Sequence, residues 1–282
     1  MAPRTPKEAP ASNSLVKWDE ELAKMAGVAA EMEAGTGGGA FFSLQGGILS
    51  FDGTPIPGNK MGVIILDSVL ENVFYEGAYD AQNPAPPTCF AFGRDESLAP
   101  HATVFEHNQE QNPVCKGCPQ NEWGSAPTGR GKACQNKRRL AIIPAGTFGK
   151  DDSFTAFTKP SEFDSTIGFL KLPVTSIKGY ANYIKQIAVT LKRPPLAVFT
   201  QVHVVPNAGN QFSVLFEAIE EVPNDLLQQI IKRNEEAKAT IEFPYNLDVE
   251  APQPRRGAPA RPAGRAAPAG RAAAPAKRGS KY

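Results

Sequence analysis

All four cysteines of this chain lie in one segment, between residues 89 and 134. Cys115 and Cys118 form a C-x2-C pair, and Cys89 and Cys134 flank the pair on either side. A two-residue gap lets both sulfurs of a tight turn point at one ion, and zinc takes four thiolates when its role is structural. The spacing therefore predicts a structural Zn²⁺ site at these four residues. Alternatives are an iron–sulfur cluster, a disulfide pair or reduced thiols buried in the core.

The remaining composition is that of a soluble protein. No run of 18 or more apolar residues occurs, and residues 1–14 lack the apolar core of a secretory signal. We therefore expect a cytoplasmic protein with no membrane partner, where a reducing environment leaves thiols free to bind a metal. At 282 residues and 41% hydrophobic, the chain can bury one sizeable core or two small ones.

The net charge of +1 conceals a separation of charge along the chain. Residues 251–282 hold eight Lys and Arg and no acid, so residues 1–250 hold 22 bases against 29 acids. A tail of Pro, Ala, Gly and Arg buries too little apolar surface to fold, and we expect residues 246–282 to be disordered. The cations of this tail could contact phosphates of a nucleic acid. Alternatively, the tail is a solubilising extension or docks on the acidic body of the same chain. The candidate contacts are Arg255, Arg256, Arg261, Arg265 and Arg271.

Residues 1–39 and residues 40–245 differ in the spacing of their apolar residues, and so in the secondary structure that they predict. Apolar residues at helical spacing between Leu15 and Met32 predict an N-terminal helix, and a glycine-rich linker at 35–39 follows it. Residues 40–245 are β-rich, with tight turns typical of a small barrel or sandwich. Strands are predicted at 40–44, 48–51, 61–75, 88–92, 139–144 and 166–172, a hairpin at 196–205 and 211–219, and helices at 177–191 and 224–236.

The segment from about 80 to 138 interrupts this pattern. It is rich in Pro, Asn, Gly and Gln, and a loop of that length needs something to hold it together, which a metal would supply. Trp123 lies in it among six cations: Lys116, Arg130, Lys132, Lys137, Arg138 and Arg139.

An aromatic ring beside cations suits single-stranded nucleic acid, because bases stack on the ring while cations follow the backbone. Trp123 could instead pack beneath the metal loop as its small core, with the cations only keeping the loop soluble. The pairs Phe41–Phe42 and Phe74–Tyr75 offer further stacking candidates, since the pleat of a strand sends one member of each pair outward.

Catalytic motifs are absent from the sequence. Its three histidines, His101, His107 and His203, form neither HExxH nor the His/Cys/Glu arrangement of zinc deaminases. There is no GxxxxGK[ST] phosphate loop and no G-x-S-x-G elbow. The sequence therefore favours a protein that is not an enzyme, although His101 or His107 could replace one cysteine as a metal ligand.

The motif C-x2-C-P…W-G-S…G-R-G-K-A-C…R-R-L, preceded by Pro87-Thr88-Cys89-Phe90, resembles a family of bacteriophage proteins often met beside replication genes. The resemblance covers roughly residues 40–235. In architecture the chain also resembles single-stranded-DNA-binding proteins in which an oligonucleotide-binding (OB) barrel carries a zinc insertion. Examples are the T4-type phage protein and the large subunit of replication protein A. This likeness implies an α+β fold: an OB-like small β-barrel core with a zinc-binding loop insertion, flanking helices and a disordered basic tail.

We therefore expect a non-enzymatic, sequence-independent single-stranded-DNA-binding protein that acts in phage DNA replication or recombination, in the host cytoplasm. Replication or recombination proteins are candidate partners, although the basic C-terminus departs from the acidic tails by which many single-strand binders recruit them. Two alternatives are a virion or DNA-packaging structural protein with a structural zinc, and an adaptor that binds a host protein through its acidic body.

Overall fold

The computed structural model describes residues 40–77, 85–127 and 130–247. The predicted N-terminal helix and the five tail arginines lie outside these described residues. Within the described ranges, no helix is long and apolar enough to cross a membrane.

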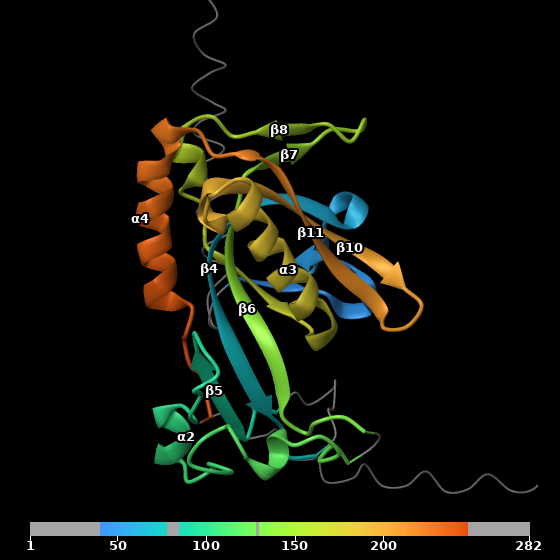
Figure 1. Cartoon of the computed structure of the whole chain (residues 1–282), viewed down its shortest axis with the longest axis vertical. Coiled ribbons are helices and arrows are strands. Elements are labelled where there is room, and N and C mark those ends of the chain that lie inside the picture. The colour runs from blue at the N-terminus through green and yellow to red at the C-terminus, as the bar shows by residue number, and fades with distance from the viewer. Residues whose placement is uncertain (1–39, 78–84, 128–129, 248–282) are drawn as a thin grey trace, which may run out of the picture.

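A nine-stranded sheet dominates the structure (Figure 1). Its strands pair in the order β11-β10-β4-β6-β9-β1-β2-β3, and β5 pairs with the far end of β4. All neighbours are antiparallel except β1 and β9. The strands are β1 (Ala40–Ser43), β2 (Ser50–Phe51), β3 (Thr54–Pro55), β4 (Lys60–Phe74), β5 (Cys89–Gly93), β6 (Gln135–Pro144), β9 (Gly168–Leu172), β10 (Val198–Asn207) and β11 (Gln211–Glu221). A separate hairpin pairs β7 (Gly146–Phe148) with β8 (Phe154–Ala156).

In the part of the chain that the structure describes, three α-helices accompany the sheet: α2 (Ala102–Glu106), α3 (Val174–Thr190) and α4 (Asn224–Thr240). The predicted helices at 177–191 and 224–236 correspond to α3 and α4, and the predicted hairpin to β10 and β11. The short helix α2 lies in the segment predicted to be irregular. The mixed α+β class is thus confirmed.

The two faces of the sheet bury two different cores, because neighbouring residues of a strand point to opposite faces. Ile65 and Ile142 face the inner cluster, which includes Tyr180, Tyr183 and Ile187 of α3. Ile64 and Ile143 face the outer cluster, which includes Leu226, Ile230 and Ala237 of α4. Because both faces of the sheet are covered, the central strands are continuous runs of apolar residues, without the alternation of apolar and polar residues seen in half-exposed strands.

The sheet curls around the inner cluster into a half-barrel. The turn Gln45–Gly47, which follows β1, lies against β10 and β11 at the other end of the strand order. A Cβ on Gly47 would lie 3.3 Å from Cβ of Phe212 on β11, so the approach is close. The four strands β10-β4-β6-β9 follow the spatial order of a Greek key, in which the fourth strand returns beside the first.

β4 and β6 extend beyond the half-barrel. They pair from Val63–Pro144 to Val73–Gln135, with a bulge between Ile65 and Asp67. Their far ends, together with β5, form a platform at one end of the molecule, where the cysteine segment and α2 lie (Figure 1).

Candidate nucleic-acid interface

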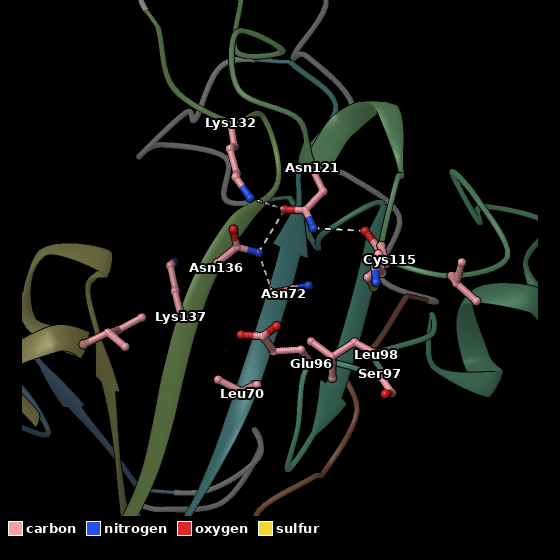
Figure 2. A pocket seen from close by; sticks show the side chains of 13 residues that line it. Leu70, Asn72, Glu96, Ser97, Leu98, Cys115, Asn121, Lys132, Asn136 and Lys137 are labelled. Atoms are coloured by element: carbon pink, nitrogen blue, oxygen red, sulfur yellow. Dashed lines mark hydrogen bonds between the residues drawn. The ribbon is translucent and has the colours of Figure 1, made fainter. Parts of the chain in front are cut away.

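A groove with a volume of about 840 Å³ lies on this platform (Figure 2). Leu70 and Asn72 of β4 and Asn136 and Lys137 of β6 contribute to its lining, and Ile177 of α3 lies at its border with the half-barrel. The cysteine segment and the β5–α2 connection supply the other lining residues: Glu96, Ser97, Leu98, Val114, Cys115, Lys116, Asn121 and Lys132.

Three of the predicted cations meet at this groove. Lys116 comes from the C-x2-C turn, Lys132 from the chain just before Cys134, and Lys137 from β6. Glu96 is the single acid among the described residues that line the groove. Burial lowers the pKa of Lys137, while the charge of Glu71 opposes that effect. The lining therefore has an excess of positive charge.

Three asparagines connect the groove floor to the cysteine segment (Figure 2). Asn136 Nδ2 donates to Oδ1 of Asn72 at 2.6 Å and to Oδ1 of Asn121 at 3.1 Å. Lys132 Nζ donates to the same Asn121 oxygen at 3.3 Å, and Asn121 Nδ2 donates to the Cys115 carbonyl at 3.0 Å. An ammonium can only donate and a carbonyl can only accept, so these partners fix the orientation of the Asn121 amide. The network holds Lys132 against the groove.

Trp123 is exposed, with 76% of its surface open to solvent. Lys132 Nζ lies 5.8 Å from the centroid of its ring, so an aromatic face and a groove lysine are neighbours. The indole is therefore free to stack, and it does not form a small core beneath the loop.

In the pair Phe41–Phe42 neither ring points outward, which differs from the expectation. Phe41 packs against the outer cluster, Phe42 against the inner cluster, and Phe74 is 9% exposed, so none of the three points into solvent. Within the described ranges, the large apolar side chains that are exposed include two aromatic rings, those of Trp123 and Phe105.

The other three predicted cations lie away from the groove lining. Arg130 is exposed in the loop. The Arg138 guanidinium lies 5.5 Å from the ring centroid of Tyr180 in the inner cluster. Arg139 is a correction to the predicted nucleic-acid surface, because it is fully buried and paired with Glu71, Nη2 to Oε1 at 2.8 Å. A guanidinium so enclosed cannot reach a strand in the groove.

The four cysteines surround one small cavity beside the groove, of about 20 Å³. Cys89 lies on β5, opposite Phe74 of β4. Gly117 has φ of 74°, a left-handed conformation that glycine adopts at little cost, and the Cys118 amide donates to the Cys115 carbonyl at 3.4 Å. This tight turn puts both cysteines of the pair on the lining of the same cavity.

Cys134 completes the lining from the start of β6. Its amide donates to the Gln120 carbonyl at 2.7 Å, and both it and Cys118 are buried. Neither His101 nor His107 is among the residues that line the cavity. Three segments of the chain thus bring four sulfurs, and no histidine, to the lining of one cavity.

All four cysteines are free thiols. Burial raises the pKa of Cys134 to about 12, and the neighbouring cysteines add to the rise. Burial also raises the pKa of Cys89 and of Cys115, while the Gln111 backbone and the Asn72 side chain donate hydrogen bonds that oppose it. As the side chains stand, the described residues contain no group of three or more His, Cys, Asp or Glu arranged to hold a metal ion. The donor set is nevertheless that of a structural zinc site, because sulfur is the ligand such sites use most and N–H donors to sulfur stabilise thiolate.

No family model matches the chain, and no curated protein or solved structure matches it. The likeness to phage proteins accordingly stays a prediction, and the function is argued from the groove and its surroundings.

The asparagine network and the buried partner of Arg139 were not predicted from the sequence. Asn72, Asn121 and Asn136 come from three separate segments, and no local pattern marks them as neighbours. Glu71 did carry a signal, because it is an acid within the otherwise apolar end of a long strand.

Proposed function

We propose that this protein binds single-stranded DNA, largely independently of sequence, in the groove on the β4–β5–β6 platform. The observation that supports this most is the convergence of Lys116, Lys132 and Lys137, from the C-x2-C turn, the chain before Cys134 and β6, on one groove beside the exposed Trp123. Lysines contact phosphates and an indole stacks on any base, which gives affinity without a sequence code. The protein would act by binding alone, without catalysis, in phage DNA replication or recombination in the host cytoplasm.

The strand order supports the comparison with an OB barrel. β4, β6, β9, β10 and β11 act as five successive strands, with β10 paired to β4 and α3 between the third and fourth. An OB fold is a partly open five-stranded Greek-key barrel that binds oligonucleotides through its second and third strands and the loop between its first and second. In this chain that loop is the β4–β6 connection, which carries two of the three groove lysines.

We further propose that Cys89, Cys115, Cys118 and Cys134 hold one structural Zn²⁺. Zinc would supply four sulfur bonds that tie β5, the C-x2-C turn and the start of β6 together. Lys116 lies between two of the ligands and Lys132 two residues before a third, so the ion would fix two of the three groove lysines. Since the side chains as they stand form no metal-binding group among the described residues, the proposal requires the cysteine side chains to rotate about Cα–Cβ so that their sulfurs point at one ion.

The DNA proposal is tested by fluorescence anisotropy with labelled single- and double-stranded oligonucleotides of the same sequence. Trp18 and Trp123 are the two tryptophans of the chain, so the Trp18→Phe variant leaves Trp123 as the only indole reporter. We expect tighter binding of the single strand and quenching of Trp123 by stacked bases. Absence of binding at low salt, or equal affinity for the duplex, would contradict the proposal.

The zinc proposal is tested by elemental analysis of the purified protein and of Cys118→Ser. We expect one zinc per chain in the natural sequence. Loss of a ligand should release the ion, since structural zinc in small sites contributes about 10–16 kcal/mol at neutral pH. The matched control is Lys116→Ala, which changes the same turn but removes no sulfur and should keep the ion. Four freely reactive thiols without metal, or iron with acid-labile sulfide, would refute the zinc assignment.

A further inference from the structure

The chain after α4 crosses the outer face of the sheet as an irregular segment, residues 241–247, which we call the strap. It runs from the end of α4 towards β5 (Figure 1). Beyond the end of α4 the described part of the strap contains no helix and no strand. Its contacts are with side chains of β1, β4, β5, β6 and β9.

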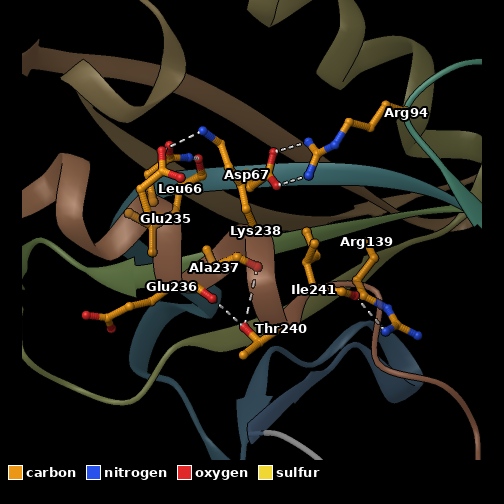
Figure 3. Close-up of polar contacts among 11 residues, drawn as sticks. Leu66, Asp67, Arg94, Arg139, Glu235, Glu236, Ala237, Lys238, Thr240 and Ile241 are labelled. Carbon is orange, nitrogen blue, oxygen red and sulfur yellow. Dashed lines mark hydrogen bonds and ion pairs between the residues drawn. The ribbon is translucent and has the colours of Figure 1, made fainter.

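Arg139 of β6 is the first anchor of the strap. Its Nη1 donates to the Ile241 carbonyl at 2.9 Å (Figure 3). The same Nη1 donates to the Phe243 carbonyl at 3.3 Å. The guanidinium lies 4.4 Å from the ring centroid of Phe92 and 4.6 Å from that of Phe243. One buried cation therefore binds two backbone oxygens of the strap between two aromatic rings.

The two aromatic side chains of the strap pack against aromatic residues of the sheet, Phe243 edge-on and Tyr245 nearly parallel to its partner. Phe243 lies with its centroid 5.5 Å from Phe41 and 5.2 Å from Phe169. Tyr245 is nearly parallel to Phe92, with centroids 6.3 Å apart. Its hydroxyl donates to Glu71 and accepts from Lys171 Nζ at 2.7 Å.

The face beneath the strap has an excess of positive charge. Arg139 and Lys171 stand beside one acid, Glu71, and the charge of Lys137 reaches the same group. Burial lowers the pKa of Lys171 to about 8; Glu71 opposes this, and Arg139 and Lys137 add to it. Since Glu71 neutralises one cation only, the uncompensated charge would be stabilised by an anion.

We propose that this outer face of β6 and β9 is a second binding face for the single strand, closed in the free protein by the strap, and that the strand displaces the strap. The inference rests on the proposed function. Aromatic rings and cations on the second and third strands are what an OB barrel offers to an oligonucleotide. The strap substitutes for that ligand. The Tyr245 ring lies nearly parallel to Phe92, as a stacked base would, and the carbonyl oxygens of Ile241 and Phe243 accept from the guanidinium as phosphate oxygens would.

Displacement of the strap would leave the sheet intact. The strap contributes no hydrogen bond to the pairing of β6 with β9 or of β9 with β1. The groups exposed by its release would be Arg139, Lys171 and the rings of Phe41, Phe92 and Phe169. A bound strand would cover the same groups, so the cost of exposing them is offset on binding.

The direct test is hydrogen exchange on the full chain, with and without a saturating single-stranded oligonucleotide. We expect the amides of residues 241–247 to lose protection when the oligonucleotide binds, while those of α3 keep theirs. Unchanged or greater protection of the strap in the complex would overturn the proposal.

An affinity measurement adds an independent test. Tyr245→Phe removes the hydroxyl that contacts Glu71 and Lys171 and should loosen the strap without emptying the space. Because the hydroxyl makes two hydrogen bonds and each is worth about 0.5–1.5 kcal/mol, we expect the oligonucleotide to bind about 5- to 160-fold more tightly. Tyr183→Phe is the matched control, since it removes a buried hydroxyl that contacts Thr200 in the inner cluster, at 2.6 Å.

The outcomes separate this proposal from the proposed function. Binding by the natural sequence with equal affinity for Tyr245→Phe, and no change in strap exchange, would leave the function standing and refute the strap. Tighter binding by Tyr245→Phe and not by Tyr183→Phe supports the strap. No binding by any of the three proteins refutes both.

Discussion

Replacing the three groove lysines should weaken DNA binding in a way that depends on salt. Lys116, Lys132 and Lys137 line the groove together, and each that neutralises a phosphate releases counterions. For single strands each contact contributes about 0.7 to the slope of log affinity against log salt. The triple variant Lys116→Ala/Lys132→Ala/Lys137→Ala should therefore have a slope shallower by about 2. Across a fourfold rise in salt, the natural sequence should lose about 20-fold more affinity than the variant.

The assay is anisotropy titration of a labelled oligonucleotide at four or five salt concentrations. A matched control removes three exposed lysines elsewhere, Lys150, Lys185 and Lys232, and so changes net charge equally. We expect the control to keep the slope of the natural sequence. Should both triple variants lose the same slope, only net charge would matter, and the reasoning that places the strand in the groove would be refuted.

Three further predictions follow from the site and its supports. Trp123→Ala should cost about 1–3 kcal/mol of binding free energy for one lost stacking contact, with the salt slope unchanged, as titrations at two salt concentrations would show; a changed slope would argue against stacking. Arg139→Met should lower the free energy of unfolding by about 3–5 kcal/mol in urea titrations, because Glu71 stays buried without its partner; a loss below about 1 kcal/mol would contradict the pairing. Stability should also fall in acid. Burial alone would raise the pKa of Glu71, but hydrogen bonds and charges from Arg139 and Lys171 outweigh it and lower the pKa below the ordinary 4.5. The stabilisation is therefore present above pH 4.5 and lost as pH falls through the lowered value, and Glu71→Gln should flatten that acid limb of the unfolding curve.

The elements that the sequence predicted well are those encoded by local periodicity. The apolar spacing between Ile177 and Leu191 reflects the face of α3 that packs on the inner cluster, and Tyr180, Tyr183 and Ile187 are buried on it. The hairpin of β10 and β11 follows from two strand-like runs around the turn at 206–210. In both cases a few neighbouring residues determine the structure, so no knowledge of the rest of the fold is needed.

The groove depends on contacts between distant segments, which periodicity does not encode. The sequence identified Lys116, Lys132 and Lys137 as a group because they lie near the cysteines, but not the asparagines that position them. Asn72 reaches Asn136 across 64 residues, and only the pairing of β4 with β6 makes them neighbours. The residue types carry the chemistry of the groove, and the strand register decides which of them meet.

Arg138 and Arg139 show why a run of cations along the chain is not a patch on the surface. β6 begins at Gln135, four residues before the strand predicted at 139, so the two arginines lie within a strand and point to opposite faces of the sheet. Both faces are covered here, and a buried guanidinium needs an acid partner. Glu71 is that partner, since an acid amid the apolar residues of β4 has the same need. Two opposite charges in neighbouring buried strands thus stabilise each other, and Arg139 also anchors the strap on the outer face, where α4 ends.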